Sequence, residues 1–104
     1  MNAFFKILSE NDVGGTGGHQ SGPLVPKGAV SLFPHLPSKT KLNPRESIEV
    51  SWDGVNWSGY QFIHYNNKLI EGKTRDEYRI TSITPAFLRQ RGSRVGNILL
   101  LERL

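Results

Sequence analysis

Apolar residues in this chain come in short runs that glycines, prolines and polar clusters interrupt. The apolar and aromatic run from Ala3 to Ser9 stops at polar Glu10, and Ile48, Val50 and Trp52 alternate with polar residues. Runs of this length and alternation are typical of β-strands, because alternate residues of a strand share one face. The sequence therefore predicts a mainly β fold of about seven short strands with two short helices, arranged as an open barrel.

The expected elements follow from these runs and from the turn signals between them. Residues 60–65 and 68–71 are predicted to form a hairpin that turns at Asn66 and Asn67, and Pro85 is predicted to open a short helix. Strands are expected over residues 3–9, 24–25, 47–52, 60–65, 68–71, 77–83 and 95–102, and helical turns over 27–33 and 84–91.

The length of 104 residues suits a single domain with one core, so residues 1–104 are expected to form one domain. The 13 Lys and Arg exceed the 9 Asp and Glu, a balance that suits a polyanionic partner without requiring one. There is no cysteine, and His35 and His64 have no clustered ligand partners, so no metal or other cofactor is expected. No apolar run could span a bilayer and no cleavable leader pattern is present, which favours a cytoplasmic protein without a membrane partner.

The stretch from Glu71 to Thr81, EGKTRDEYRIT, carries the densest set of charged side chains. Its Gly-Lys-Thr resembles the end of a phosphate-binding loop, but the first glycine of that motif would stand at position 67, where the chain has Asn67. The segment before it is also apolar and extended. A nucleotide-binding loop is therefore not expected here.

A second interpretation is a small magnesium-dependent nuclease. Asp53, followed by Glu71 and Lys73, has the order of two metal-binding carboxylates and a lysine that orients water. A triplet of this kind also arises by chance in a chain of this size, and Asp53 begins an ordinary Asp-Gly turn signal. The nuclease remains an alternative on sequence grounds.

A third interpretation uses the alternation of the side chains. On an extended segment Lys73, Arg75, Glu77 and Arg79 would project from one face. Arg can bond guanine O6 and N7, and Glu can accept from cytosine N4, so Arg75 and Glu77 together could read a G·C pair. Lys73 and Arg79 would suit phosphate contacts. The same pattern is equally typical of a solvated strand face with cross-strand ion pairs.

Three longer blocks add a family resemblance. LSENDVGGTGGHQSGPLVPKG, LNP and GKTRDEYRIT, which together run from Leu8 to Thr81, resemble the N-terminal effector domain of the EcoRII-type restriction endonucleases. The resemblance implies a DNA-binding pseudobarrel, the fold of the plant B-three transcription-factor domains, in which two arms enter the major groove. It places residues 11–22 in the N-terminal arm and residues 73–79 in the C-terminal arm.

The resemblance also implies a set of DNA-binding residues. His19 falls on the functional histidine of the N-terminal arm, where Asn11 and Gln20 have the amide chemistry to bond adenine. The residues on C-terminal arm contact positions are Lys73, Thr74, Arg75, Glu77 and Arg79. Two positions depart from the family pattern: Tyr78 stands where a lysine is expected, and Leu24 stands near a tyrosine position.

The function implied by the resemblance is sequence-specific binding of double-stranded DNA, with CCWGG as the expected target. Such a domain is the non-catalytic effector part of a Type IIE-like restriction endonuclease in a bacterial or archaeal cytoplasm. Its partners are then double-stranded DNA and a nuclease catalytic domain outside these residues. A transcription-factor-like DNA binder is a further alternative, because it would use the same arms without a linked nuclease.

Overall fold

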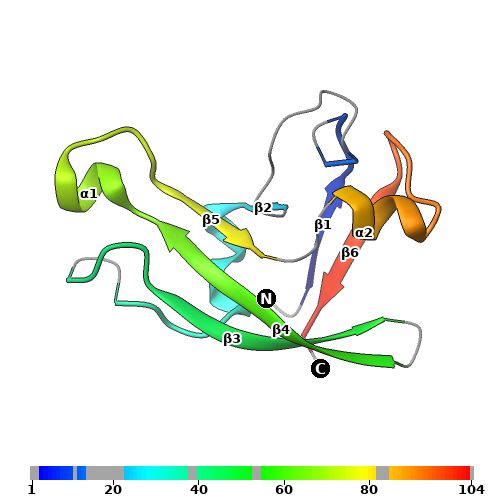
Figure 1. Cartoon of the computed structure of the whole chain (residues 1–104), viewed down its shortest axis with the longest axis horizontal. Coiled ribbons are helices and arrows are strands. Elements are labelled where there is room, and N and C mark those ends of the chain that lie inside the picture. The colour runs from blue at the N-terminus through cyan, green and yellow to red at the C-terminus, as the bar shows by residue number, and fades with distance from the viewer. Residues whose placement is uncertain are drawn as a thin grey trace.

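The computed structural model describes residues 3–10, 12–13, 23–37, 40–52, 55–81 and 85–103. These residues form two antiparallel sheets and few short helices, so the expected mainly β, open pseudobarrel architecture is confirmed (Figure 1). The elements in chain order are β1 (Ala3–Ile7), β2 (Leu24–Val25), the 3₁₀ helix η1 (Lys27–Leu32), β3 (Arg45–Trp52), β4 (Val55–Tyr65), α1 (Asn67–Glu71), β5 (Glu77–Ile80), α2 (Pro85–Gln90) and β6 (Ile98–Glu102).

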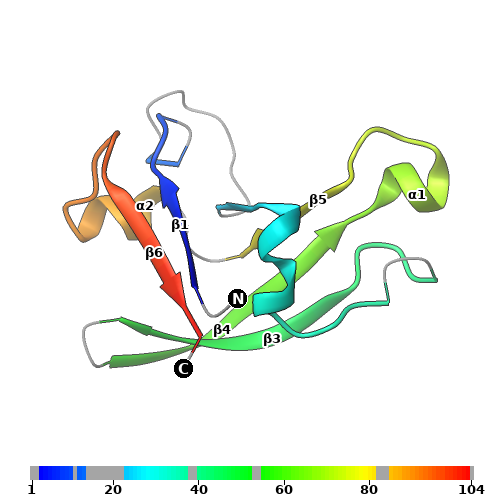
Figure 2. The same ribbon diagram turned by 180° about the vertical axis from the view of Figure 1, so that it is seen from behind.

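The larger sheet has the strand order β2-β5-β4-β3, and the smaller sheet is the ribbon of β1 and β6. The two sheets share no strand pairing among the described residues, which leaves the barrel open. The 3₁₀ helix η1 connects them, because it contacts both β1 and β5 (Figure 2). Within the described residues no helix is long and apolar enough to cross a membrane.

A ladder of aromatic rings connects the two sheets. Phe33, which follows η1, stacks on Phe62 of β4 with ring centroids 4.4 Å apart and meets Phe4 of β1 edge-on at 6.2 Å. Phe62 in turn stacks on Tyr78 of β5 at 5.5 Å. Phe62 and Ile80 are fully buried, so they form the centre of the core. Such aromatic pairs add to the stabilisation from the buried area itself.

One expected element is wrong. Residues 68–71 were predicted as the second strand of a hairpin, but they lie in the helix α1, which begins at Asn67. Gly72 ends this helix in the left-handed region at φ 67°, with its N–H bonded to the Asn67 carbonyl. The paired strand of the expected hairpin is therefore missing, and β4 pairs instead with β3 and β5.

The long hairpin of β3 and β4 contains a bulge at Gly59. Ile48 faces Tyr60, but Val50 faces Trp57, so two residues of β4 stand opposite one residue of β3. Gly59 has φ 85°, a conformation that a glycine adopts without steric cost. Bulges of this kind increase the twist of a hairpin, which here continues past the core and below β6 (Figure 1).

Replacing Gly59 by alanine is expected to destabilise the domain by about 1 kcal/mol, because an L side chain resists positive φ. The added Cβ would meet no atom within 4 Å, so the cost is conformational and not a clash. Urea unfolding measures it. The matched control is Gly28→Ala in η1, where the Cβ also meets nothing but the φ is ordinary. Equal stability of the two variants would contradict this role for Gly59.

Candidate nucleic-acid interface

The segment from α1 to β5 projects from one end of the larger sheet and is closed by hydrogen bonds to Asn67. The Asn67 side-chain oxygen accepts the Arg75 N–H at 2.7 Å, and its carbonyl accepts the Lys73 N–H at 3.1 Å. The Lys68 N–H donates to the Arg75 carbonyl at 2.9 Å. These bonds close residues 67–75 into a loop, which holds the backbone of Arg75 at the start of the C-terminal arm in place.

On one face of the C-terminal arm (residues 73–79), the Glu77 carboxylate pairs with two arginines. Arg75 donates from Nε to Glu77 Oε1 at 2.7 Å, and its Nη2 pairs with the same oxygen. Arg79 Nη2 donates to Glu77 Oε2 at 3.1 Å. These contacts place Arg75, Glu77 and Arg79, three of the four side chains predicted to share a face, on the same face. The Arg75 guanidinium also lies over the Tyr65 ring, 3.9 Å from its centroid, a cation–π contact that limits its rotamers.

The arginines keep Glu77 ionised. Burial raises the pKa of the Glu77 carboxyl, but hydrogen bonds and charge from Arg75 and Arg79 outweigh burial, so the pKa lies below its usual range. The face therefore carries a fixed carboxylate acceptor beside two guanidinium donors. Arg75 is the more exposed of the two arginines, with 39% of its side chain accessible against 17% for Arg79.

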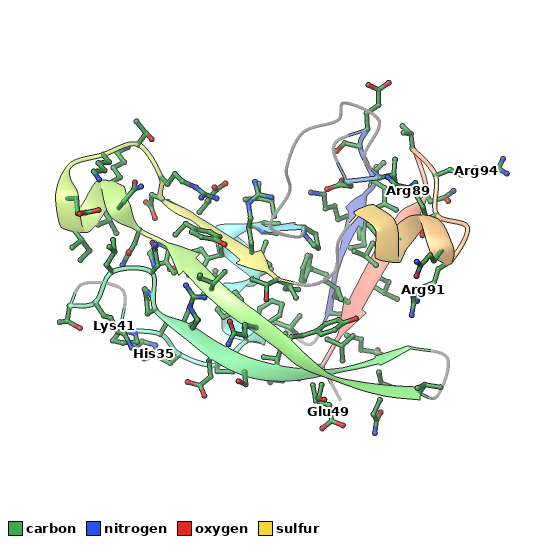
Figure 3. The ribbon with its side chains drawn as sticks, viewed as in Figure 1. His35, Lys41, Glu49, Arg89, Arg91 and Arg94 are labelled. Carbon is green, nitrogen blue, oxygen red and sulfur yellow. The ribbon has the colours of Figure 1, made fainter. Side chains whose placement is uncertain are left out.

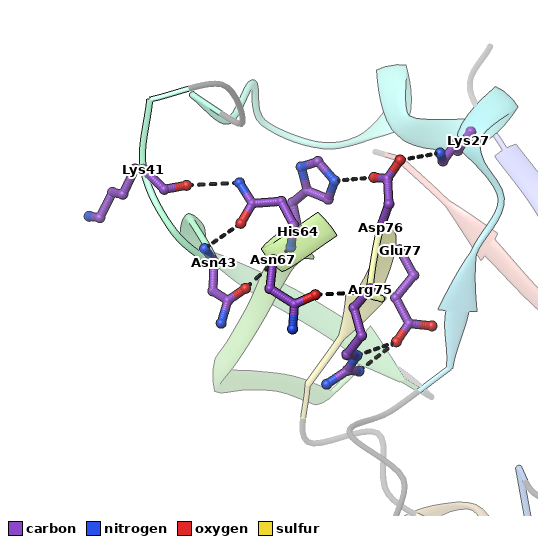
Figure 4. Close-up of polar contacts among 9 residues, drawn as sticks. Lys27, Lys41, Asn43, His64, Asn67, Arg75, Asp76 and Glu77 are labelled. Atoms are coloured by element: carbon purple, nitrogen blue, oxygen red, sulfur yellow. Dashed lines mark hydrogen bonds and ion pairs between the residues drawn. The ribbon is translucent and has the colours of Figure 1, made fainter. Parts of the chain in front are cut away.

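The opposite face of the arm is attached to the core through Asp76. Asp76 Oδ1 lies 2.7 Å from His64 Nε2, and Asp76 Oδ2 accepts from Lys27 Nζ at 2.7 Å (Figure 4). Hydrogen bonds from Lys27 and then from His64 hold the pKa of the Asp76 carboxyl below its usual range. Asp76 thereby links β4, η1 and the start of β5.

His64 is 1% exposed and stacks on Tyr78, with ring centroids 4.0 Å apart. An ionised carboxylate only accepts hydrogen bonds, so the proton between His64 and Asp76 is carried by Nε2. The other ring nitrogen, Nδ1, has no hydrogen-bond partner among the described residues. Tyr78, one of the two departures from the family pattern, thus packs on the attached face and not on the face of Arg75 and Glu77.

The base of the arm is held by a reciprocal pair of asparagines. Asn43 donates its N–H to the Asn66 side-chain oxygen at 2.7 Å, and the Asn66 N–H donates to the Asn43 side-chain oxygen at 3.2 Å. The Asn66 amide also donates to the Lys41 carbonyl at 2.8 Å (Figure 4). Asn66 is fully buried, and Asn43 adopts φ 49°, which asparagine tolerates better than most residues. Neither this pair nor the His64–Asp76 bond was predicted from the sequence.

The segment assigned to the N-terminal arm leaves β1 through a tight turn. The Asp12 carboxylate accepts from the Ser9 N–H at 2.8 Å and pairs with Lys6 at 3.1 Å. Burial raises the pKa of Asp12, but the bonds from Ser9 and Lys6 together lower it below its usual range. Arg89 of α2 donates to the Val13 carbonyl at 2.8 Å. Asn11, His19 and Gln20 lie outside the described residues.

The remaining predicted contact residues lie at the tip of the C-terminal arm. Lys73 and Thr74 are exposed in the bend between α1 and β5, and Lys73 Nζ lies 3.7 Å from the Glu71 carboxylate. Asp53, the first residue of the nuclease alternative, lies outside the described residues. Among the residues that the structure describes, no group of three or more His, Asp or Glu side chains is placed to hold a metal ion.

Two comparisons with known proteins give matches that cover most of the chain. The family model described as the N-terminal domain of restriction endonuclease EcoRII matches residues 1–103. The Type II restriction enzyme EcoRII of Escherichia coli is 43% identical over 81 residues, which cover 75% of this chain and 20% of that enzyme. The chain thus spans about a fifth of the length of this relative.

Proposed function

The chain belongs to the family of EcoRII restriction endonuclease N-terminal domains, and from this premise we propose that it binds double-stranded DNA sequence-specifically through two arms in the major groove. CCWGG is the proposed target. The observation that carries the proposal is the Arg75–Glu77–Arg79 face, because it presents guanidinium donors beside a fixed carboxylate. On the opposite face Asp76 bonds His64 and Lys27, which attaches the arm to the core.

The hydrogen-bond capacity of this face suits a G·C pair. A carboxylate has about four acceptor sites and an arginine has about five N–H donors. Arg75 uses two acceptor sites on Oε1 of Glu77, and Arg79 uses one site on Oε2. Oε2 therefore has one site left that can accept from cytosine N4. Arg75 gives two of its donors to Glu77, which leaves its other guanidinium edge for guanine O6 and N7.

The other proposed contacts provide affinity and adenine recognition. Lys73 and Thr74 lie exposed at the tip of the arm, where an ammonium and a hydroxyl suit phosphate oxygens. In the N-terminal arm we assign His19 to a base or phosphate, and Asn11 and Gln20 to adenine, on the family resemblance alone. These contacts would orient the duplex so that Arg75 and Glu77 meet the same base pair in each complex.

Within its parent protein the domain is proposed to act as a non-catalytic effector. The nuclease catalytic domain is its proposed partner and lies outside these 104 residues, as the small share of the EcoRII relative that the chain covers suggests. Occupancy of the effector by a second target copy would then change the activity of the catalytic domain, through a coupling free energy between the two DNA sites.

The test is a titration of the chain against a fluorescent CCWGG duplex and a duplex with one G·C pair exchanged, without metal and at two salt concentrations. The CCWGG duplex is expected to bind at least about tenfold tighter at both salt concentrations. Weak binding of equal strength to both duplexes, with a steep salt dependence, would leave only a basic surface and overturn the proposal.

A further inference from the structure

The segment from Pro85 to Leu101 carries three arginines and no acidic residue. Arg89 lies in α2, and Arg94 lies in the connection from α2 to β6; both are exposed. Neither forms an ion pair within the part of the chain that the structure describes. Exposed arginines that form no ion pair are a feature expected of a phosphate-contacting surface.

The backbone that carries Arg94 is fixed in position. Its N–H donates to the Asn97 side-chain oxygen at 2.8 Å, and its carbonyl accepts the Asn97 N–H at 3.0 Å. The same turn is bonded to the end of β1, because Gly96 N–H donates to the Leu8 carbonyl at 2.9 Å and Leu8 N–H donates to the Asn97 carbonyl at 2.8 Å. Arg94 is therefore held beside the point where the N-terminal arm segment begins.

Arg89 is held beside the same segment by its bond to the Val13 carbonyl. That bond uses one donor of Nη1, so the rest of the guanidinium can still donate to a phosphate. Figure 3 shows Arg89 and Arg94 on the upper side of α2, whereas Arg91 lies on its lower side. The two arginines thus extend the side of the molecule from which the C-terminal arm also projects.

The dimensions of the domain place these arginines far from the C-terminal arm. α1 and the connection from α2 to β6 lie at opposite ends of the longest axis, along which the Cα atoms extend 39 Å (Figure 1). At about 3.4 Å per base pair, a duplex along this axis spans about eleven base pairs, whereas CCWGG occupies only about 17 Å. A duplex that lies along this axis with CCWGG at the C-terminal arm would therefore pass Arg89 and Arg94 outside the recognition site.

We propose that Arg89 and Arg94 contact backbone phosphates of the DNA that flanks the recognition site, on the side of the N-terminal arm. This inference rests on the proposed function and adds a second contact surface to it. The contact is independent of sequence, since it involves only phosphates, so it increases affinity and salt dependence without changing the target.

Duplex length tests the inference. Arg94→Gln is titrated against a CCWGG duplex of about nine base pairs, which ends close to the site, and one of about twenty. Loss of one phosphate contact is expected to weaken binding of the long duplex about three- to tenfold and to lower the salt slope by about one, with the short duplex unaffected. Arg89→Gln is expected to reduce affinity for the long duplex in the same way.

The matched control is Lys41→Gln, which also removes one positive charge. Lys41 is exposed and lies near the opposite end of the molecule, below α1 (Figure 3). It is expected to change binding of the long and short duplexes equally. If Arg94→Gln weakens both lengths alike, or neither, the flanking contact is wrong. Failure of the proposed function would be recognised separately, because the unmodified chain would then show no preference for CCWGG at either length.

Discussion

Glu77→Gln is expected to remove most of the preference for CCWGG over a duplex with one G·C pair exchanged. Glutamine keeps the size of the side chain but replaces one acceptor oxygen by an NH₂ group, which cannot accept from an arginine or from cytosine N4. A good base contact contributes about 1–3 kcal/mol of discrimination, so the affinity ratio should fall about five- to 150-fold. Paired fluorescence titrations at one salt concentration measure the ratio.

The control for this prediction is Lys73→Gln on the same arm. The Lys73 side chain is 63% exposed and pairs only at 3.7 Å with Glu71. It is proposed to contact phosphate, so its loss should weaken binding of both duplexes equally and leave the ratio unchanged. Thermal unfolding of both variants confirms that each is folded at the titration temperature. If Glu77→Gln kept the full ratio while folded, the assignment of Glu77 to base reading would be wrong.

The side-chain alternation that this prediction depends on could be read from the sequence. Strand geometry alone separates Arg75 and Glu77 from Asp76 and Tyr78, and the structure confirms that separation. The short helix opened by Pro85 and the strands around Ile48 and Phe62 were also predictable, because each is specified by neighbours within a few residues. Local patterns therefore identified the face that Arg75 and Glu77 share.

What the sequence could not reveal depends on contacts between distant residues. The Asn66-Asn67 pair has the composition of a hairpin turn, yet the Asn66 side chain bonds the Lys41 carbonyl, 25 residues away, and Gly72 allows a helix to end. His64 looked isolated because its partner Asp76 is 12 residues away. No local pattern reports such pairs, so the residues that hold the arm were missed although the residues that face outward were found.

This division has a physical reason. The residues proposed to contact DNA must remain accessible, so they are expected on an exposed segment whose period is visible in the sequence. Residues that support them work by satisfying buried polar groups, and those partners are brought together only by the fold. The Asp76 carboxylate belongs to the second class, and its importance follows from its position behind Arg75 and Glu77.

Asp76→Asn is expected to cost about 1–3 kcal/mol of unfolding free energy at neutral pH, because the buried His64 N–H and the Lys27 ammonium lose a charged acceptor. It should also reduce the CCWGG preference, although Asp76 faces away from Arg75 and Glu77, because the arm would lose its attachment to β4 and η1. Urea unfolding and paired titrations well below the melting temperature measure the two effects.

The pH dependence separates this role from a general packing effect. The pKa of Asp76 is lower in the folded state than in the unfolded state. Its contribution to the free energy of unfolding is therefore fully present above the unfolded carboxyl pKa of about 3.9, and it is lost as pH falls through the lower folded pKa. The stability difference between the natural chain and Asp76→Asn should therefore be constant from neutral pH down to about pH 5 and shrink below it. Lys27→Met removes only the exposed partner, so it should cost under about 1 kcal/mol. A difference that persisted unchanged in strong acid would mean that the Asp76 charge does not hold the arm.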